Sequence, residues 1–197
     1  MRDQSDCQHG FTRGRSTVTA LSEILGAVGS SSSASKYVQL IFLDISGAFD
    51  NAWWPMILLK LKQKGCPPNL YKMMRDCFTN RRIWFIVGGR AESRTPITGC
   101  PQGSVVGPAL WNLLLDDMFR LPLPVGCRLV AYADDVTAVV EGDSRALIEK
   151  KSKELLDTVA AWGIRNRLEF SSSKSRTMTI KGRLQRAPVL GLQGVCQ

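Results

Sequence analysis

Two acidic positions in this chain directly follow runs of β-forming residues. Asp44 comes after the run 38–43 and Asp134 after the run 128–133, and the apolar pattern resumes at Val136. Carboxylates at the tips of neighbouring strands are oxygen ligands suited to two Mg²⁺ ions about 3.5–4 Å apart, the arrangement used for phosphoryl transfer on nucleic acids. Because such carboxylates repel each other without a cation, the sequence predicts a divalent-metal site at Asp44 and Asp134, with Asp135 beside it.

An Asp-Asp doublet by itself is more typical of an ordinary turn than of a metal site. The doublet Asp134-Asp135 differs because a second acidic strand tip, Asp44, is available to it. The doublet Asp116-Asp117 lies inside a predicted helix and has no such partner strand. We therefore leave it out of the predicted site.

The net charge of +9 favours a polyanionic partner. Between residues 162 and 186 the chain carries seven basic residues and one acid, Glu169. A smaller basic cluster, at positions 81, 82, 90 and 94, brackets the apolar stretch 83–87. Solvated faces are the alternative interpretation of both clusters. A membrane surface is a weaker alternative, because the basic segment is not laid out as an amphipathic helix.

Composition excludes several other classes. The six cysteines are scattered without a CxxC pair and His9 is the single histidine, which argues against a zinc site and against a Ser–His–Asp hydrolase. No apolar run of about 18 residues is present, and the first residues have no apolar signal-peptide region. We expect an intracellular protein with reduced thiols and, at 44% apolar residues, a sizeable core.

Hydrophobic periodicity predicts alternating helices and strands. Because helices interposed between strands pack on one face of an antiparallel sheet, we expect an α+β layer in which the tip of the first strand neighbours the Asp-Asp hairpin. The expected helices are 16–28, 55–64, 67–78, 105–119 and 144–165, and the expected strands are 37–43, 82–88, 92–97, 127–133, 136–141 and 177–180.

Five blocks of the sequence carry a resemblance to a known family. They are 8–17 (QHGFTRGRST), 42–50 (FLDISGAFD), 99–108 (GCPQGSVVGP), 132–135 (YADD) and 168–174, in the family's order and spacing. With them the chain resembles the reverse transcriptase domain of a non-LTR (LINE-type) retrotransposon, of the type found in arthropods. YADD alone is weakly specific, whereas five blocks in register are not expected by chance.

The resemblance implies a polymerase palm with two Mg²⁺ ions, for which Mn²⁺ can substitute. Asp44 and Asp134 match the metal-binding aspartates, the Ile45 carbonyl is a further ligand, and Asp135 assists the site. Lys174 matches the lysine that protonates the leaving pyrophosphate. The alternative for Lys174 is a solvated lysine in a basic run.

The resemblance also implies contacts with nucleotide and nucleic acid. Phe49 lies where the family places a ring under the incoming sugar, and Gln102 and Gly103 match a nucleotide and template contact. A core phenylalanine and a helix-capping loop are the respective alternatives. The expected contacts with nucleic acid are Arg13, Arg15, Arg165, Arg167 and Arg176.

The expected organisation is a partial fingers segment at 1–36, the palm at 37–182 and a tail at 183–197 that leads toward a primer grip and thumb, both absent. The implied function is RNA-directed DNA polymerisation in retrotransposition, with poor activity of this fragment alone. The implied partners are an RNA template, a DNA primer or target DNA, dNTPs and the remaining Pol polyprotein segments, with no membrane, in the nucleus. The alternatives are an inactive nucleic-acid-binding remnant and an RNA polymerase or maturase-like protein.

Overall fold

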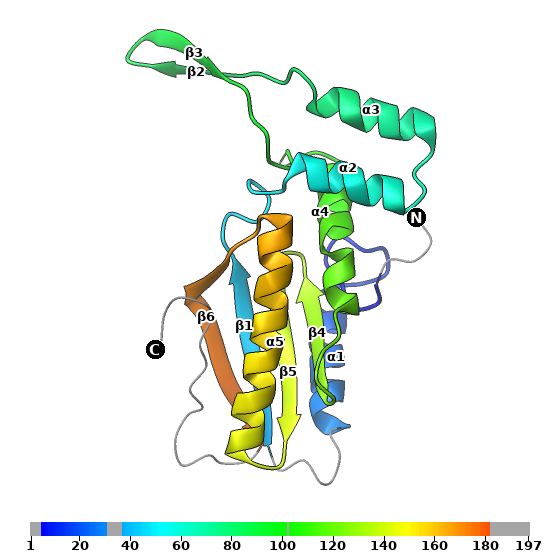
Figure 1. Cartoon of the computed structure of the whole chain (residues 1–197), viewed down its shortest axis with the longest axis vertical. Coiled ribbons are helices and arrows are strands. Elements are labelled where there is room, and N and C mark those ends of the chain that lie inside the picture. Colours follow the sequence, from blue (N-terminus) through cyan, green and yellow to red (C-terminus); the bar gives the residue numbers. More distant parts are fainter. Residues whose placement is uncertain (1–4, 31–36, 102, 182–197) are drawn as a thin grey trace.

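The protein is described by a computed structural model that covers residues 5–30, 37–101 and 103–181. Its helices, strands and one 3₁₀ helix alternate along the chain much as the periodicity predicts (Figure 1). In chain order they are α1 (Thr17–Gly29), β1 (Tyr37–Ile45), α2 (Trp54–Gln63), α3 (Pro68–Phe78), β2 (Ile83–Val87), β3 (Arg90–Arg94), α4 (Gly107–Leu115), η1 (Asp116–Arg120), β4 (Cys127–Tyr132), β5 (Asp135–Gly142), α5 (Arg145–Asn166) and β6 (Phe170–Lys181).

The larger sheet has four strands in the order β4-β5-β1-β6, and every neighbouring pair is antiparallel. β1 and β5 are the inner strands, and their register runs from Tyr37 opposite Gly142 to Leu43 opposite Val136. The tip of β1 and the turn between β4 and β5 lie at the same end of this sheet (Figure 1). The predicted antiparallel sheet with neighbouring strand tips is confirmed.

The main core lies between this sheet and the helices α4 and α5. Alternate residues of β1, such as Ile41 and Leu43, face this core together with Leu155 and Trp162 of α5. Figure 1 shows α5 lying along the sheet on this side. The inward-facing alternate residues of the strand therefore pack against the apolar face of the helix in a single interface.

The opposite face of the sheet has a helix of its own. Val38 and Leu40 of β1 point to this face and pack with Ala27 of α1 in a second apolar cluster. α1 is closed at its start by Ser16, whose hydroxyl accepts a hydrogen bond from the Thr19 amide. The expectation of helices on one face therefore holds for α5, while α1, which we assigned to the fingers segment, covers part of the other face.

Several element bounds differ from the prediction: the strand expected at 92–97 is Arg90–Arg94, and the strand expected at 37–43 continues to Ile45. Two further elements differ more. The helix expected at 105–119 is an α-helix only from Gly107 to Leu115 and continues as the 3₁₀ helix η1. Two lysines of the α2 segment form ion pairs with the start of η1. Lys64 Nζ lies 2.6 Å from Asp116 Oδ2, and Lys60 Nζ lies 2.7 Å from Asp117 Oδ1. The last strand begins at Phe170 rather than at 177, because β6 pairs with β1 as far as Ile45 opposite Phe170. Its serine-rich first half has no apolar alternation, so the pairing with β1 makes it a strand.

The smaller sheet is the hairpin β2–β3, which projects away from the main sheet beyond α2 and α3 (Figure 1). Its chain then returns to the main body, where Thr98 forms a bridge with Trp53 and the Cys100 amide donates to the Phe49 carbonyl. Within the described residues, no helix is both long and apolar enough to cross a membrane.

Candidate functional site

Three aspartates, Asp44, Asp134 and Asp135, lie at the same end of the main sheet. Asp44 directly follows Leu43 and Asp135 directly precedes Val136, and Leu43 and Val136 are paired across β1 and β5. Asp134 lies in the turn between β4 and β5, which is closed by the pairing of Tyr132 with Asp135. The structure thus brings together the carboxylates that the sequence placed at neighbouring strand tips, from two segments about 90 residues apart.

The electrostatics of these carboxylates favour a cation. Burial raises the pKa of Asp135, and the negative charges of Asp134 and Asp44 raise it further. Although 37% of the Asp44 side chain is exposed, its Oδ2 atom is buried and has no hydrogen-bond partner among the described residues. A buried carboxylate oxygen without a donor is unfavourable, so this oxygen is suited to a divalent cation.

Among the described residues, no group of three or more Asp, Glu, His or Cys side chains is placed so that it could hold a metal ion. Mg²⁺ in nucleotide-using sites is usually held by one or two protein carboxylates, with waters and substrate phosphates as the remaining ligands. A site in which Asp44 and Asp134 are the protein's main ligands fits that coordination chemistry.

Lys174 lies next to the carboxylates. Its Nζ is 3.8 Å from Asp44 Oδ2, although 69% of the lysine side chain remains exposed. β6 is fixed beside Asp44 by the pairing of Asp44 with Ser171 and by the Ser175 hydroxyl, which accepts from the Asp44 amide at 3.3 Å. Both the predicted role in proton donation and the alternative of a solvated lysine are compatible with this exposure.

Phe49 lies in the turn after β1, half-buried among aromatic rings. Its ring stacks on Trp111 with centroids 5.3 Å apart and meets Phe11 edge-on at 5.8 Å. Ile45, the predicted carbonyl ligand, is buried at the end of β1 and pairs with Phe170. Packing on core residues holds the Phe49 ring in place, so its contacts are compatible both with a core role and with a fixed wall beside the metal site.

The loop before α4 contains the predicted nucleotide contact. Gln102 lies outside the described residues, so the structure says nothing of its side chain. Gly103 has a φ of +76°, which only glycine adopts readily, and open space surrounds the position of an added Cβ. The Ser104 hydroxyl accepts from the Gly107 amide and donates to the Pro101 carbonyl, so this loop also caps α4.

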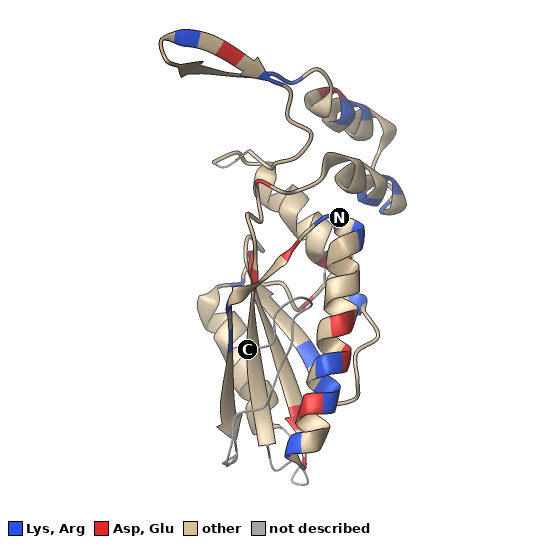
Figure 2. Cartoon of the chain, turned by 60° about the vertical axis from the view of Figure 1, so that its left-hand side comes forward, with Lys and Arg blue, Asp and Glu red and all other residues tan. Residues whose placement is uncertain are grey.

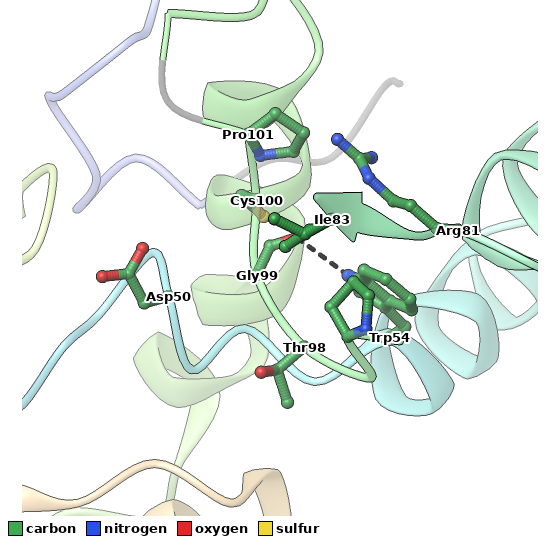
Figure 3. Close-up of a pocket in the computed structure, with 9 residues that line it drawn as sticks. Asp50, Trp54, Arg81, Ile83, Thr98, Gly99, Cys100 and Pro101 are labelled. Atoms are coloured by element: carbon green, nitrogen blue, oxygen red, sulfur yellow. Dashed lines mark hydrogen bonds between the residues drawn. The ribbon is translucent and has the colours of Figure 1, made fainter. Parts of the chain in front are cut away.

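A cavity of about 290 Å³ is lined by residues of both segments, among them Asp50 next to Phe49 and Pro101 in the loop before α4. Figure 3 shows Arg81 and Pro101 on one side of it and Asp50 on the other. The Trp54 side chain also lines the cavity, and its indole N–H donates to the Gly99 carbonyl at 2.8 Å. The cavity therefore borders the segments that the resemblance assigns to the nucleotide, with one basic and one acidic side chain in its wall.

The two arginines of the N-terminal block differ in their surroundings. Arg13 is exposed. The Arg15 guanidinium donates to the Asp6 carboxylate, to the Asp6 carbonyl and to the Gln8 carbonyl, and 24% of its side chain is exposed. Arg15 thus stabilises the loop that contains it, and its contact with phosphate stays a prediction.

The three later arginines lie along α5, its C-terminus and β6. Arg165 is exposed, Arg167 lies with its guanidinium carbon 4.0 Å from the centre of the Trp53 ring, and Arg176 is exposed on β6. In Figure 2 charges of both signs alternate along α5, so this helix is not a uniformly basic surface. Contacts of these three arginines with nucleic acid stay predictions.

The structure adds one residue that the sequence analysis did not assign to the site. The Gln8 side chain is buried and hydrogen-bonds to Ala133, the residue before Asp134. Gln8 belongs to the first block of the resemblance, but its partner lies 125 residues away. No local pattern in the sequence predicts such a contact.

Comparisons with known proteins agree with this geometry. A family model described as "Reverse transcriptase (RNA-dependent DNA polymerase)" matches residues 2–193. The chain is 38% identical over 188 residues to a putative 115 kDa protein in the type-1 retrotransposable element R1DM of Drosophila melanogaster, covering 95% of this chain and 18% of that protein. It is 34% identical over 193 residues to a retrovirus-related Pol polyprotein from the type-1 retrotransposable element R1 of Bradysia coprophila, covering 96% and 19%. The chain therefore spans about a fifth of the length of these curated relatives.

The fold has a solved counterpart in the apo telomerase of Candida tropicalis. The two superpose with a TM-score of 0.65 at 10% sequence identity, over 96% of this chain and 35% of that one. At this identity the likeness concerns the fold alone, and it supports the expected palm-like architecture. Because the family match covers nearly the whole chain and the retrotransposon relatives are 34–38% identical across it, this chain belongs to the reverse transcriptase (RNA-dependent DNA polymerase) family, as the reverse transcriptase domain of a non-LTR retrotransposable element.

Proposed function

We propose that this chain forms the catalytic palm of an RNA-directed DNA polymerase that adds dNTPs to a primer 3′-hydroxyl during retrotransposition. The observation that carries the proposal is the placement of Asp44, Asp134 and Asp135 at one end of the sheet. The buried Asp44 Oδ2 has no hydrogen-bond donor among the described residues, and the Lys174 ammonium lies 3.8 Å from it. Asp44 and Asp134 would hold two Mg²⁺ ions, the Ile45 carbonyl would be a further ligand, and Asp135 would support the site.

Divalent cations bound at these residues would lower the pKa of the primer 3′-hydroxyl and neutralise the departing pyrophosphate. Lys174, whose Nζ is 3.8 Å from Asp44 Oδ2, is within reach of the same region. Its ammonium donates a proton to the pyrophosphate as it leaves. Catalysis in this chemistry consists mainly of positioning and charge stabilisation, so few other side chains are required.

Phe49 selects the sugar of the incoming nucleotide. Its ring is held between Trp111 and Phe11, so it cannot swing aside without breaking those contacts. A fixed ring beneath the sugar clashes with a 2′-hydroxyl and thereby favours dNTPs over rNTPs. Gln102 and Gly103 contact the nucleotide or template strand.

The partners follow from the same proposal. The template is RNA and the primer is DNA, in keeping with the net charge of +9, and Arg13, Arg15, Arg165, Arg167 and Arg176 contact their phosphates. Residues 1–36 contribute part of the fingers, 37–182 form the palm, and 183–197 lead toward the primer grip and thumb. Because the chain spans about a fifth of its relatives, other Pol polyprotein segments complete the enzyme, which acts in the nucleus.

The decisive test measures Mn²⁺ binding by electron paramagnetic resonance in the presence of a dNTP. The wild-type chain is compared with the double variant Asp44→Asn/Asp134→Asn. Asp157→Asn is the matched control, because Asp157 is a carboxylate on α5 that pairs with Lys153. We expect the double variant to lose Mn²⁺ binding and the control to keep it. Equal binding by all three proteins would show that these aspartates do not form the metal site.

A further inference from the structure

The side-chain amide of Gln8 holds the turn that carries Asp134. Gln8 is 1% exposed. Its Nε2 donates to the Ala133 carbonyl at 3.0 Å, and its Oε1 accepts from the Ala133 amide at 3.1 Å. The same oxygen accepts from the Gly10 amide at 2.8 Å. One amide group therefore satisfies both backbone groups of the residue directly before Asp134.

The Gln8 backbone is itself anchored to the edge of the sheet. Gln8 forms a parallel bridge with Ala131 of β4, in which the His9 amide donates to the Ala131 carbonyl and the Ala131 amide donates to the Cys7 carbonyl, both at 2.8 Å. The Asn112 side chain on α4 donates to the Gly10 carbonyl at 2.9 Å. The Gln8 side chain therefore enters the turn from a fixed backbone position.

The turn requires such support. Ala133 has a φ of +59°, a left-handed conformation in which an L-residue with a Cβ is strained. Strained residues persist where their surroundings over-determine them. Besides Gln8, the Trp111 indole N–H donates to the Ala133 carbonyl at 3.2 Å. These bonds fix the backbone immediately before Asp134. They thereby orient the Asp134 side chain.

We propose that Gln8 is a positioning residue that fixes the turn at Ala133 and so places Asp134 against Asp44 for metal binding. We call the two hydrogen bonds between the Gln8 side chain and the Ala133 backbone the Gln8 clamp. The effect of this clamp on metal binding rests on the proposed function. Glutamine is suited to this role because one side chain supplies both a donor and an acceptor. Groups that orient metal ligands through hydrogen bonds typically change metal affinity by 10–100-fold when removed.

Two variants distinguish the loss of the Gln8 hydrogen bonds from a general loss of folding stability. Gln8→Met keeps the length of the side chain and removes both hydrogen bonds to Ala133. Gln39→Met is the matched control, because it makes the same change at another glutamine that is 1% exposed. The Gln39 Nε2 donates to the Thr177 hydroxyl on β6, and Gln39 lies opposite Val140, away from the turn at Ala133.

The first readout is metal-independent. Amide hydrogen exchange at Ala133, followed by NMR on the ¹⁵N-labelled chain, should speed up at least tenfold in Gln8→Met. Gln39→Met should change it by less than about threefold once the rates are corrected for global unfolding. If exchange at Ala133 is unchanged in Gln8→Met, the clamp does not exist and the proposal is overturned.

The second readout is the Mn²⁺ dissociation constant with a dNTP present. We expect it to rise about 10–100-fold in Gln8→Met and to stay within about twofold in Gln39→Met, even where both variants lower the unfolding midpoint. Equal loss of affinity in both variants would reduce Gln8 to a structural residue and overturn its positioning role. Absence of Mn²⁺ binding by the wild-type chain would instead overturn the metal site, and the exchange rates would still decide whether Gln8 holds the turn.

Discussion

A methyl group at Gly10 tests how closely the N-terminal block approaches the Asp134 turn. A Cβ added there would lie 2.1 Å from the Ala133 nitrogen and 2.6 Å from its Cα, and both are backbone atoms that cannot rotate away. The segment around Gly10 and the turn must therefore separate by roughly 1 Å or more to reach ordinary contact distances of about 3.5–4 Å. Three hydrogen bonds depend on that approach, two between Gln8 and Ala133 and one from the His9 amide to the Ala131 carbonyl.

The magnitude follows from those bonds. A net contribution of about 0.5–1.5 kcal/mol for each puts the loss of stability in Gly10→Ala at about 1.5–4.5 kcal/mol. Gly26→Ala is the matched control, because Gly26 lies in α1 with nothing within 4 Å of its added Cβ. Alanine there should raise stability by up to about 1 kcal/mol.

Urea unfolding followed by fluorescence of the five tryptophans measures both variants against the wild-type chain. The expected result is a lower transition midpoint for Gly10→Ala, with an unchanged dependence on urea, and a slightly higher midpoint for Gly26→Ala. If Gly10→Ala unfolds within about 0.5 kcal/mol of wild type, the close approach is absent and the reasoning about the turn is refuted.

Further predictions concern the site and the core. In the full-length enzyme, Phe49→Val should admit rNTPs in single-nucleotide insertion assays, whereas Phe49→Tyr should keep the wild-type preference; an unchanged rNTP-to-dNTP ratio in the valine variant would refute the gate. Lys174→Met should slow single-turnover primer extension about 100-fold or more while Mn²⁺ binding persists, and a change of less than about threefold would exclude proton donation. Burial raises the pKa of Cys100 and of Cys127 to about 11, so at pH 8 about one such thiol in a thousand is ionised. Iodoacetamide should therefore modify the exposed Cys77 first, and labelling of Cys100 and Cys127 should rise about tenfold per pH unit below pH 11. Equal labelling rates of the three thiols at pH 8 would contradict the packing.

The parts of the site that the sequence predicts are those with a local signal. Asp44 and Asp134 each follow a β-forming run, and a strand ends where its apolar pattern meets a turn, so their placement at strand tips can be inferred without the fold. Their proximity needed one further assumption, that the two strand tips lie together in an antiparallel layer. The register of β1 and β5 confirms that assumption.

The parts that the sequence does not predict depend on long-range contacts. The first half of β6 is rich in serine and carries Lys174, and it becomes a strand because β1 offers it an edge. α1 is amphipathic, but its periodicity does not say which face of which sheet it covers. The role of Gln8 is hidden for a different reason, since a polar residue in a glycine-containing block predicts a loop and its burial depends on β4.

These long-range contacts bear on where the catalytic unit begins. The sequence predicts a partial fingers segment at residues 1–36, and that assignment stays a prediction. Gln8 pairs with the edge strand β4, and α1 packs through Ala27 on the face of the sheet opposite α5. An edge strand with unpaired backbone groups is open to incorrect pairing, and the N-terminal segment covers part of that edge while it clamps the Asp134 turn.

We infer that truncation before residue 37 would expose β4 and loosen the metal site together, so a minimal palm should include the N-terminal block. The loss of both solubility and Mn²⁺ binding on such truncation would support this boundary, and a soluble truncated chain with wild-type Mn²⁺ affinity would refute it.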